Sequence, residues 1–365
     1  MIFKEIINRG HEQVSYFHDP TLELKGIVAI HNTVLGPALG GCRMWNYKSE
    51  QDALIDVLRL SKGMTYKAAI AGLNLGGGKA VIIGDPKADK SEELFRSFGR
   101  FIEGLGGRYI TAEDVGTSIK DMDYVRMETK YVTGISKSLG GSGDPSLLTS
   151  FGTYLGIKAS VKFKLNKSSL EGLSIVVQGL GSVGMELVKY LSNDGMKIYA
   201  YDIDSDLINS AKERYGVIPI KEDMVYDQDV DIYAPCALGA TINDETIPRL
   251  KCSIIAGAAN NVLKDPVKHS KELLDRGILY APDYAINAGG LINVYNELED
   301  YNKERAFSQA EAIYDILMDI FYRSDKENIP TTIASDRKAE ERINKIASLK
   351  SFYLPNRKKT ILKGR

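Results

Sequence analysis

The chain has 365 residues, which is too long for one ordinary hydrophobic core and suits two domains. Hydrophobic residues make up 44% and charged residues 26%, as in ordinary globular proteins, and the formal net charge is -1. A charge so close to zero gives no whole-chain field that would attract nucleic acid or an anionic membrane.

The spacing of the cysteines and histidines and the length of the apolar runs narrow the class of protein further. The three cysteines are widely spaced and the four histidines form no cluster, so the sequence predicts neither a disulfide framework nor a metal site. No apolar run reaches the ~18 residues of a membrane span. The N-terminal residues lack the basic and apolar regions of a signal peptide. We therefore expect a cytoplasmic protein with reduced thiols and no membrane partner.

Strand-like and helix-like segments alternate in the first part of the chain. In chain order we expect a strand at 26–33, a helix at 49–69, a strand at 79–85, a helix at 90–106 and a strand at 108–114. Ser49 and Ser91 are candidate N-caps, because a serine hydroxyl can accept a hydrogen bond from the first turn of a helix. This alternation indicates an α/β domain.

A segment rich in Gly, Ser and Pro at 136–150 could act as a hinge between two domains. Beyond it we expect a helix at 145–163, a strand–helix–strand unit at 173–204, strands at 231–237, 252–259 and 277–283, and one or two long helices at 287–323. The predicted fold is therefore α/β with two domains separated by a cleft. The first comprises residues 1–135, with 330–365 packing back on it, and the second is a Rossmann-type domain of residues 136–329.

The tail after about residue 330 should be helical at first and basic at its end. We interpret this charge as a solvated or subunit-packing surface rather than as an arm that binds nucleic acid.

Gly179, Gly181 and Gly184 follow the order GxGxxG between an apolar strand and a helix, and Asp202 ends the next strand. In such a unit the glycines allow a tight turn, close approach to a pyrophosphate and helix–strand packing. The pyrophosphate would lie on the helix N-terminus, where Ser182 and Val183 stand. Asp202 would accept hydrogen bonds from the adenosine ribose and repel a 2′-phosphate. The pattern thus predicts NAD rather than NADP as the cofactor.

The stretch GLNLGGGKAVI at 72–82 runs three glycines into Lys79. A P-loop would need a glycine where Leu73 stands and a hydroxyl residue where Ala80 stands, so that interpretation fails. Lys67 lies near the end of the preceding helix, and Asp114 ends the third predicted strand, where α/β folds present reactive groups. Two lysines and an acid in one cleft could bind an amino acid carboxylate and supply a base.

Several long motifs show that the sequence resembles the Glu/Leu/Phe/Val dehydrogenase family, and within it most closely the leucine-specific members. They include GPALGGCRMW (36–45), LSKGMTYKAAIAGLNLGGGKAVIIGDP (60–86), GRYITAEDVGTS (107–118), AGAANNVL (256–263) and YAPDYAINAGGLINV (280–294). The resemblance implies NAD-dependent, reversible oxidative deamination of branched-chain L-amino acids (leucine, also valine and isoleucine) to 2-oxo acids and ammonium. It also implies a homo-oligomer, with an octamer plausible.

The resemblance further implies roles for particular residues. Lys67 would hold the substrate carboxylate, Lys79 would activate the water that attacks the imine, and Asp114 would exchange a proton with the amine. Other residues expected at the substrate are Gly40, Gly41 and Asn261. Further residues expected at the cofactor are Thr149, Ala237, Asn260 and Asn287.

The expected side-chain pocket is apolar or weakly polar. Its residues are Leu39, Met64, Ala112, Thr133, Leu291 and Val294. An unpaired glutamate side chain would be costly in such a pocket, so we do not expect glutamate as the substrate. Leu291 stands where leucine-specific members often carry Val, and the extra methylene could tilt the preference among branched-chain substrates. The alternatives that stay open are a phenylalanine- or tryptophan-type dehydrogenase and a non-catalytic NAD-binding sensor.

Overall fold

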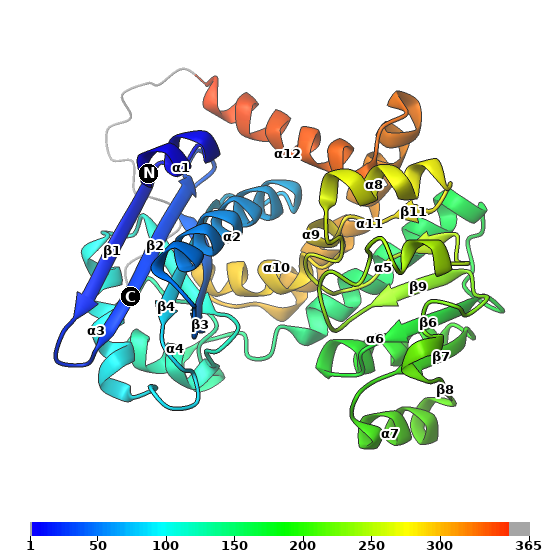
Figure 1. Ribbon diagram of the computed structural model, residues 1–365, viewed down its shortest axis with the longest axis horizontal. Coiled ribbons are helices and arrows are strands. Elements are labelled where there is room, and N and C mark those ends of the chain that lie inside the picture. The colour runs from blue at the N-terminus through cyan, green and yellow to red at the C-terminus, as the bar shows by residue number, and fades with distance from the viewer. Residues whose placement is uncertain (1, 350–365) are drawn as a thin grey trace. The chain divides into compact units, whose positions relative to one another are not determined.

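The computed structural model describes residues 2–349, and these form two compact units (Figure 1). The first unit contains residues 2–144, 293–303 and 339–349, and the second contains residues 145–292 and 304–338. The expected α/β fold is confirmed in both units. None of the helices in the described part of the chain has the length and apolar composition that a membrane crossing needs.

A five-stranded sheet forms the centre of the first unit. Its strands are β1 (Gln13–Asp19), β2 (Leu24–Asn32), β3 (Ala38–Trp45), β4 (Gly76–Ile83) and β5 (Tyr109–Glu113), in the spatial order β1-β2-β4-β3-β5. Strands β3, β4 and β5 run parallel, whereas β2 is antiparallel to both β1 and β4. The carboxyl ends of β3, β4 and β5 therefore point the same way.

Helices flank the strands of the first unit, and two of them correspond to the helices expected at 49–69 and 90–106. The helices are α1 (Ile2–Arg9), α2 (Glu50–Ile70), α3 (Glu92–Gly104) and α4 (Ile119–Arg126), with short 3₁₀ turns η1 (Lys137–Leu139) and η4 (Asn296–Glu299). Ser49 accepts a hydrogen bond of 3.1 Å from the N–H of Asp52, and Ser91 accepts one of 3.1 Å from the N–H of Leu94. Both predicted N-caps are thus confirmed.

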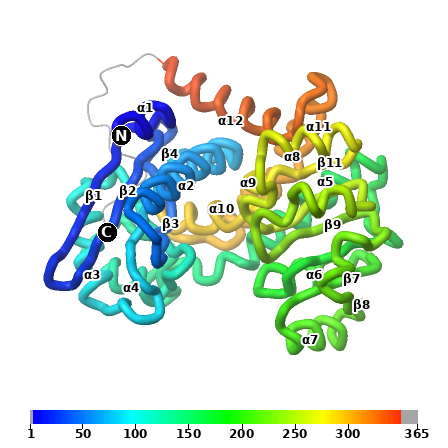
Figure 2. The backbone as a smooth tube through the Cα atoms, viewed as in Figure 1, coloured from blue at the N-terminus to red at the C-terminus, as the bar shows by residue number. Residues whose placement is uncertain are grey.

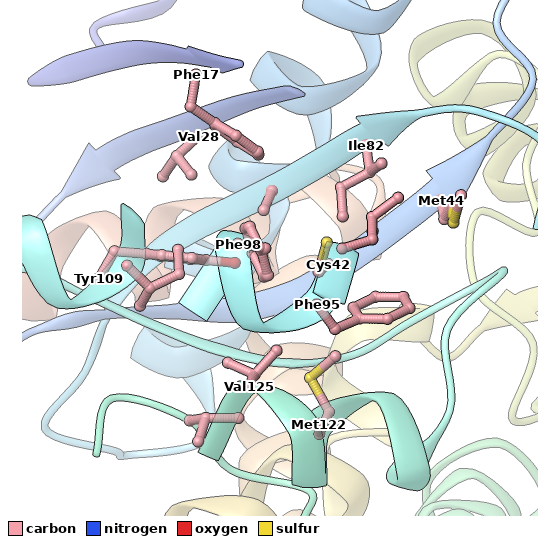
Figure 3. Close-up of a cluster of buried hydrophobic side chains, with 14 of the residues drawn as sticks. Phe17, Val28, Cys42, Met44, Ile82, Phe95, Phe98, Tyr109, Met122 and Val125 are labelled. Atoms are coloured by element: carbon pink, nitrogen blue, oxygen red, sulfur yellow. The ribbon is translucent and has the colours of Figure 1, made fainter. Parts of the chain in front are cut away.

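Alternating side chains of the sheet pack against helices on its two faces. Phe95 and Phe98 of α3 and Met122 of α4 join Val28, Ile82 and other strand residues in one buried cluster (Figure 3). Leu54, Val57 and Leu58 of α2 pack on Ile27 and Val81 on the opposite face. Because neighbouring strand residues point to opposite faces, Arg43 and Lys79 lie on the α2 side.

A six-stranded parallel sheet forms the centre of the second unit. Its strands are β6 (Ser174–Gln178), β7 (Lys197–Tyr201), β8 (Ile218–Pro219), β9 (Ile232–Pro235), β10 (Ile254–Ile255) and β11 (Leu279–Tyr280). The spatial order is β11-β10-β9-β6-β7-β8, and every pairing is parallel. This is the dinucleotide-binding order 3-2-1-4-5-6, with its switch point between β6 and β9.

Helices precede, connect and follow these strands, as Figure 2 lets the reader follow along the chain. They are α5 (Ser146–Leu165), α6 (Ser182–Asn193), α7 (Ser205–Tyr215), α8 (Pro266–Asp275) and α9 (Asp283–Ile286), with η2 (Glu222–Met224) and η3 (Ile247–Arg249). Helices α10 (Gly289–Tyr295), α11 (Lys303–Glu327) and α12 (Thr331–Ala347) each cross a boundary between the units. The tail that was expected to be helical after about residue 330 is α12, and the basic end of the tail lies outside the described residues.

The first unit extends further than residue 135, and residues 293–303 also belong to it. The reason is Glu297, whose carboxylate accepts hydrogen bonds of 2.8 Å from the backbone N–H groups of both Gly134 and Ser142. Asn293 adds a hydrogen bond of 2.7 Å to the Ser142 hydroxyl. The expected hinge segment is therefore tied to a returning part of the chain as far as residue 144.

Strand β4 begins at Gly76, so the glycine run is part of the strand rather than a turn before it. Strand β3 was not among the expected elements, because it contains Gly40 and Gly41 and glycine is a poor strand former. These two strands nevertheless pair along their length, which brings Lys79 into the middle of a sheet.

Candidate active site

Lys79 and Asp114 form an ion pair in the first unit, in which Lys79 is buried and Asp114 is partly buried. The Lys79 ammonium lies 3.0 Å from Oδ1 of Asp114, and the lysine side chain is only 6% exposed. Lys79 comes from β4, and Asp114 directly follows β5, two strands away in the sheet. The structure therefore brings together two of the three charged residues that the sequence singled out.

A second cation, Arg43 of β3, contacts the other oxygen of the same carboxylate. Its Nε donates a hydrogen bond of 2.9 Å to Oδ2 of Asp114. Burial by itself would raise the pKa of the Asp114 carboxyl, but the positive charges of Lys79 and Arg43 outweigh burial and hold that pKa below its usual range. Asp114 is thus an ionised carboxylate between two cations.

Arg43 was not among the residues predicted for the site. Its Nη1 donates a hydrogen bond of 2.9 Å to Asp56 of α2, and the Tyr47 hydroxyl donates one of 2.8 Å to the same carboxylate. Alternation along β3 could have indicated that Arg43 shares a sheet face with Lys79. No sequence signal, however, connects Arg43 to Asp114 or to Asp56.

The glycines around Lys79 allow neighbouring backbone segments to pack closely. A Cβ atom on Gly40 would lie 1.9 Å from the Gly78 carbonyl oxygen, and one on Gly41 would lie 2.3 Å from the Glu113 carbonyl oxygen. A Cβ atom on Gly77 would lie 2.1 Å from the backbone nitrogen of Thr65. Only glycine fits at these positions, so one role of the run is to seat β4 against β3 and α2.

The residues expected to line the side-chain pocket divide between the two units. Leu39, Ala112 and Thr133 are buried in the first unit, and Met64 lies close to Gly40, with its Cγ 3.2 Å from the position of a Gly40 Cβ. Lys67 is in the last turn of α2, one helical turn beyond Met64. Val294 belongs to the first unit, whereas Leu291, which is buried, and Asn261, which is exposed, belong to the second.

The glycine-rich turn of the second unit has the geometry expected of a dinucleotide site. Gly179 has a φ of +104°, and a Cβ on Gly184 would lie 2.0 Å from the Gly179 carbonyl oxygen. A Cβ on Gly181 would meet no neighbouring atom within 4 Å, and this residue begins α6 without a side-chain cap. The N–H groups of Ser182 and Val183 at this helix end are therefore suited to an anion.

Asp202 is held against this turn, since its Oδ2 accepts a hydrogen bond of 2.5 Å from the Leu180 N–H. Ala237 follows β9 across the switch point, and its Cβ lies 2.6 Å from the position of a Gly179 Cβ. Both residues stand at the carboxyl edge of the sheet, which is where nucleotides bind in such folds.

Two predicted cofactor residues contact each other, because Asn287 donates a hydrogen bond of 2.8 Å to the Asn260 side chain. Asn287 also donates one of 3.0 Å to the Ala258 carbonyl oxygen. The Thr149 hydroxyl donates to the Pro145 carbonyl oxygen at 2.9 Å. Among residues 2–349, no group of His, Cys, Asp and Glu side chains is arranged to hold a metal ion.

Two family models match the chain. Residues 11–131 match the Glu/Leu/Phe/Val dehydrogenase dimerisation domain, and residues 201–350 match the Glutamate/Leucine/Phenylalanine/Valine dehydrogenase domain. Leucine dehydrogenase from Thermoactinomyces intermedius is 52% identical over 360 residues, which cover 99% of this chain and 98% of that protein.

Relatives named for other amino acids are also similar. Phenylalanine dehydrogenase from Caldalkalibacillus thermarum is 46% identical over 95% of each chain. The crystal structure of L-tryptophan dehydrogenase from Nostoc punctiforme superposes with a TM-score of 0.86 at 45% identity, covering 96% of this chain and 100% of that one. These relatives are all named as dehydrogenases, but of different amino acids.

Proposed function

Because the chain belongs to the Glu/Leu/Phe/Val dehydrogenase family, we propose that it catalyses the NAD-dependent oxidative deamination of branched-chain L-amino acids, with leucine foremost. Membership of this family makes the chain an amino acid dehydrogenase. The leucine preference rests on the higher identity to leucine dehydrogenases, 52% against 46% for the phenylalanine and tryptophan enzymes.

The observation that carries the chemistry is the ion pair between the buried Lys79 and the partly buried Asp114, 3.0 Å apart. In this proposal Lys79 positions and activates the attacking water, while Asp114 exchanges a proton with the substrate amine. A pair with limited solvent access is suited to this task, because a lower local dielectric strengthens its electrostatic effect on the reacting atoms.

Lys67, at the end of α2, would pair with the substrate carboxylate, because its flexible side chain can bring a positive charge to that group. The backbone at Gly40 and Gly41 would border the same carboxylate. Leu39, Met64, Ala112, Thr133, Leu291 and Val294 would surround the substrate side chain, and Asn261 would contribute from the second unit.

NAD is the cofactor that we propose, and it would accept the hydride from the substrate Cα when bound. The open space beside Gly181, the uncapped start of α6 and the Asp202 carboxylate fit a dinucleotide with a free ribose 2′-hydroxyl. Thr149, Ala237, Asn260 and Asn287 would border the nicotinamide half. Asp204, two residues after Asp202, adds a negative charge that disfavours a 2′-phosphate.

A phenylalanine or tryptophan preference is the second candidate, because dehydrogenases named for these amino acids are 46% identical to this chain. The proposed pocket residues are apolar or weakly polar and would accept an aromatic side chain if they leave enough room. The family model of residues 11–131 is described as a dimerisation domain, which supports a homo-oligomeric assembly.

Absorbance at 340 nm tests this proposal, since NADH absorbs there and NAD does not. Purified protein is mixed at alkaline pH with NAD or NADP and with one of L-Leu, L-Val, L-Ile, L-Phe, L-Trp or L-Glu. Strong signals with branched-chain acids and NAD would support the whole proposal. Signals only with Phe or Trp would keep the reaction but change the substrate, and no signal with any acid would point to a protein that binds NAD without catalysis.

A further inference from the structure

We propose that Arg43 is a positioning residue for the reaction. It holds one oxygen of Asp114, so that the other oxygen is left to exchange the proton. This inference rests on the proposed function, in which Asp114 exchanges a proton with the substrate amine. Arg43 would act through Asp114 and not on the substrate itself.

The two oxygens of Asp114 have different partners. Oδ2 accepts the hydrogen bond of 2.9 Å from Nε of Arg43, and Oδ1 lies 3.0 Å from the Lys79 ammonium. A carboxylate held at one point could rotate and interchange its oxygens. With Oδ2 fixed to the planar guanidinium, Oδ1 stays beside Lys79 and becomes the oxygen that can take up a proton.

The guanidinium is itself anchored at a second point. Nη1 of Arg43 donates a hydrogen bond of 2.9 Å to Oδ2 of Asp56, while the Tyr47 hydroxyl and the Arg59 guanidinium also contact this carboxylate, at 2.8 and 2.9 Å. Asp56 lies on α2 and Arg43 on β3, so the arginine bridges a helix and the end of β5. A lysine could keep the charge but could not make both contacts in one plane.

The surroundings of Asp114 decide how it would respond to the loss of this arginine. Besides Lys79 and Arg43, titratable groups that interact electrostatically with Asp114 are Cys42, Tyr47, Tyr109 and Glu113. Arg43 is a permanent cation beside Asp114, and Glu113 is a further acid. Loss of the Arg43 charge would therefore favour the protonated over the deprotonated form of each member of the Lys79–Asp114 pair.

Three variants test the proposal in the full-length protein, with kcat and KM measured for the preferred amino acid and NAD from pH 6 to 11. Arg43→Met removes the charge and both hydrogen bonds, so we expect kcat to fall about 100-fold and the acidic limb of the kcat profile to move to higher pH. Arg43→Lys keeps the charge, so we expect kcat to fall about 10-fold with the limb in place. In both variants the KM for NAD should stay within about twofold of the wild type.

The matched control is Arg96→Met, because Arg96 also bridges two carboxylates, Glu92 and Glu128, but belongs to α3 on the other face of the sheet. This variant should keep the kcat and the pH profile of the wild type. A positioning role is overturned if Arg43→Met keeps kcat within threefold, or if its kcat falls while the acidic limb stays in place. If Arg43→Met does not fold, an unchanged kcat in Arg43→Lys overturns the role instead.

The failure of this inference can be told apart from the failure of the proposed function. A wild-type protein that oxidises no amino acid contradicts the proposed function before any variant is made. A wild-type protein that is active, together with Arg43 variants of unchanged kcat, contradicts only the role of Arg43.

Discussion

Arg342 of α12 donates a hydrogen bond of 2.6 Å to the carbonyl oxygen of Leu73, which lies 269 residues earlier in the chain. The same guanidinium donates to the carbonyl oxygens of Ala69 and Gly72, at 3.2 and 2.9 Å. These carbonyls belong to the end of α2 and to the turn that leads into β4. A residue of the last described helix thus satisfies acceptors that a helix end leaves without intrahelical partners.

We expect Arg342→Met to lower the free energy of unfolding by about 1–3 kcal/mol, because several carbonyl groups lose a charged donor. Urea unfolding followed by circular dichroism measures this change. Arg337→Met is the control on the same helix, since Arg337 forms an exposed ion pair with Glu327, and such pairs contribute only about 0–1 kcal/mol. Equal losses in the two variants would contradict a special role of Arg342.

Features encoded within short stretches were predictable from the sequence. Ser49 and Ser91 cap their helices because the signal and its partner lie within one turn. The GxGxxG unit with Asp202 likewise lies within one strand–helix–strand segment, and its place in a dinucleotide-type sheet is confirmed. The glycine run, the preceding helix and the end of the third predicted strand likewise indicated Lys79, Lys67 and Asp114 as candidates, and the resemblance to a known family then implied their roles.

Features that depend on distant residues were not predictable in this way. Arg43 meets Asp114, 71 residues later, and Glu297 meets Ser142, 155 residues earlier, and neither pair has a local pattern. Strand β3 was missed because its glycines have low strand propensity and are selected by contact with Gly78 and Glu113. Tertiary packing, rather than local preference, decides such elements.

Lys79→Ala should retain NAD binding and lose kcat by at least ~100-fold, the usual contribution of a general base. NAD binding can be followed by quenching of protein fluorescence, and kcat by absorbance at 340 nm. Lys189→Ala is a suitable control, because Lys189 is an exposed lysine paired with Glu186 in the second unit. Near-normal turnover in Lys79→Ala would remove this lysine from its proposed role.

Asp202→Asn should weaken NAD binding and reduce the discrimination against NADP, because the amide keeps the size of the side chain but loses its charge. The ratio of kcat/KM for NAD to that for NADP measures this effect, which we expect to be at least ~10-fold. Asp275→Asn, at an exposed position of α8, serves as the control. An unchanged cofactor ratio in Asp202→Asn would argue against a contact with the ribose.

Leu291→Val should shift the ratio of kcat/KM for leucine to that for valine, since one methylene is worth about 1–3 kcal/mol in a hydrophobic pocket. Leu291 is 4% exposed and lies on α10. Its neighbour Ile292, which is 1% exposed, offers the control Ile292→Val on the same helix. If the two variants give the same ratio, Leu291 does not line the substrate pocket.

The buried His11 and the partly buried His31 form a pair that should make the first unit sensitive to acid. Their rings meet edge to face with centroids 4.8 Å apart. Desolvation by burial, followed by the charge of His31, lowers the pKa of His11 from 6.5 to about 4. Desolvation, followed by the charge of Lys62, lowers the pKa of His31 from 6.5 to about 4. In the unfolded chain both would titrate near 6.5.

Between pH 6.5 and 4 the unfolded state therefore binds more protons than the folded state, so stability falls as the pH falls through this range. We expect the free energy of unfolding to drop by roughly 2 kcal/mol from pH 7.5 to pH 5, after discounting for the partial exposure of His31. Replacing both histidines by Gln should remove most of this dependence, whereas His18→Gln, at an exposed position, should leave it unchanged. Urea unfolding at the two pH values measures the difference, and an equal pH dependence in the wild type and the double variant would show that other groups cause it.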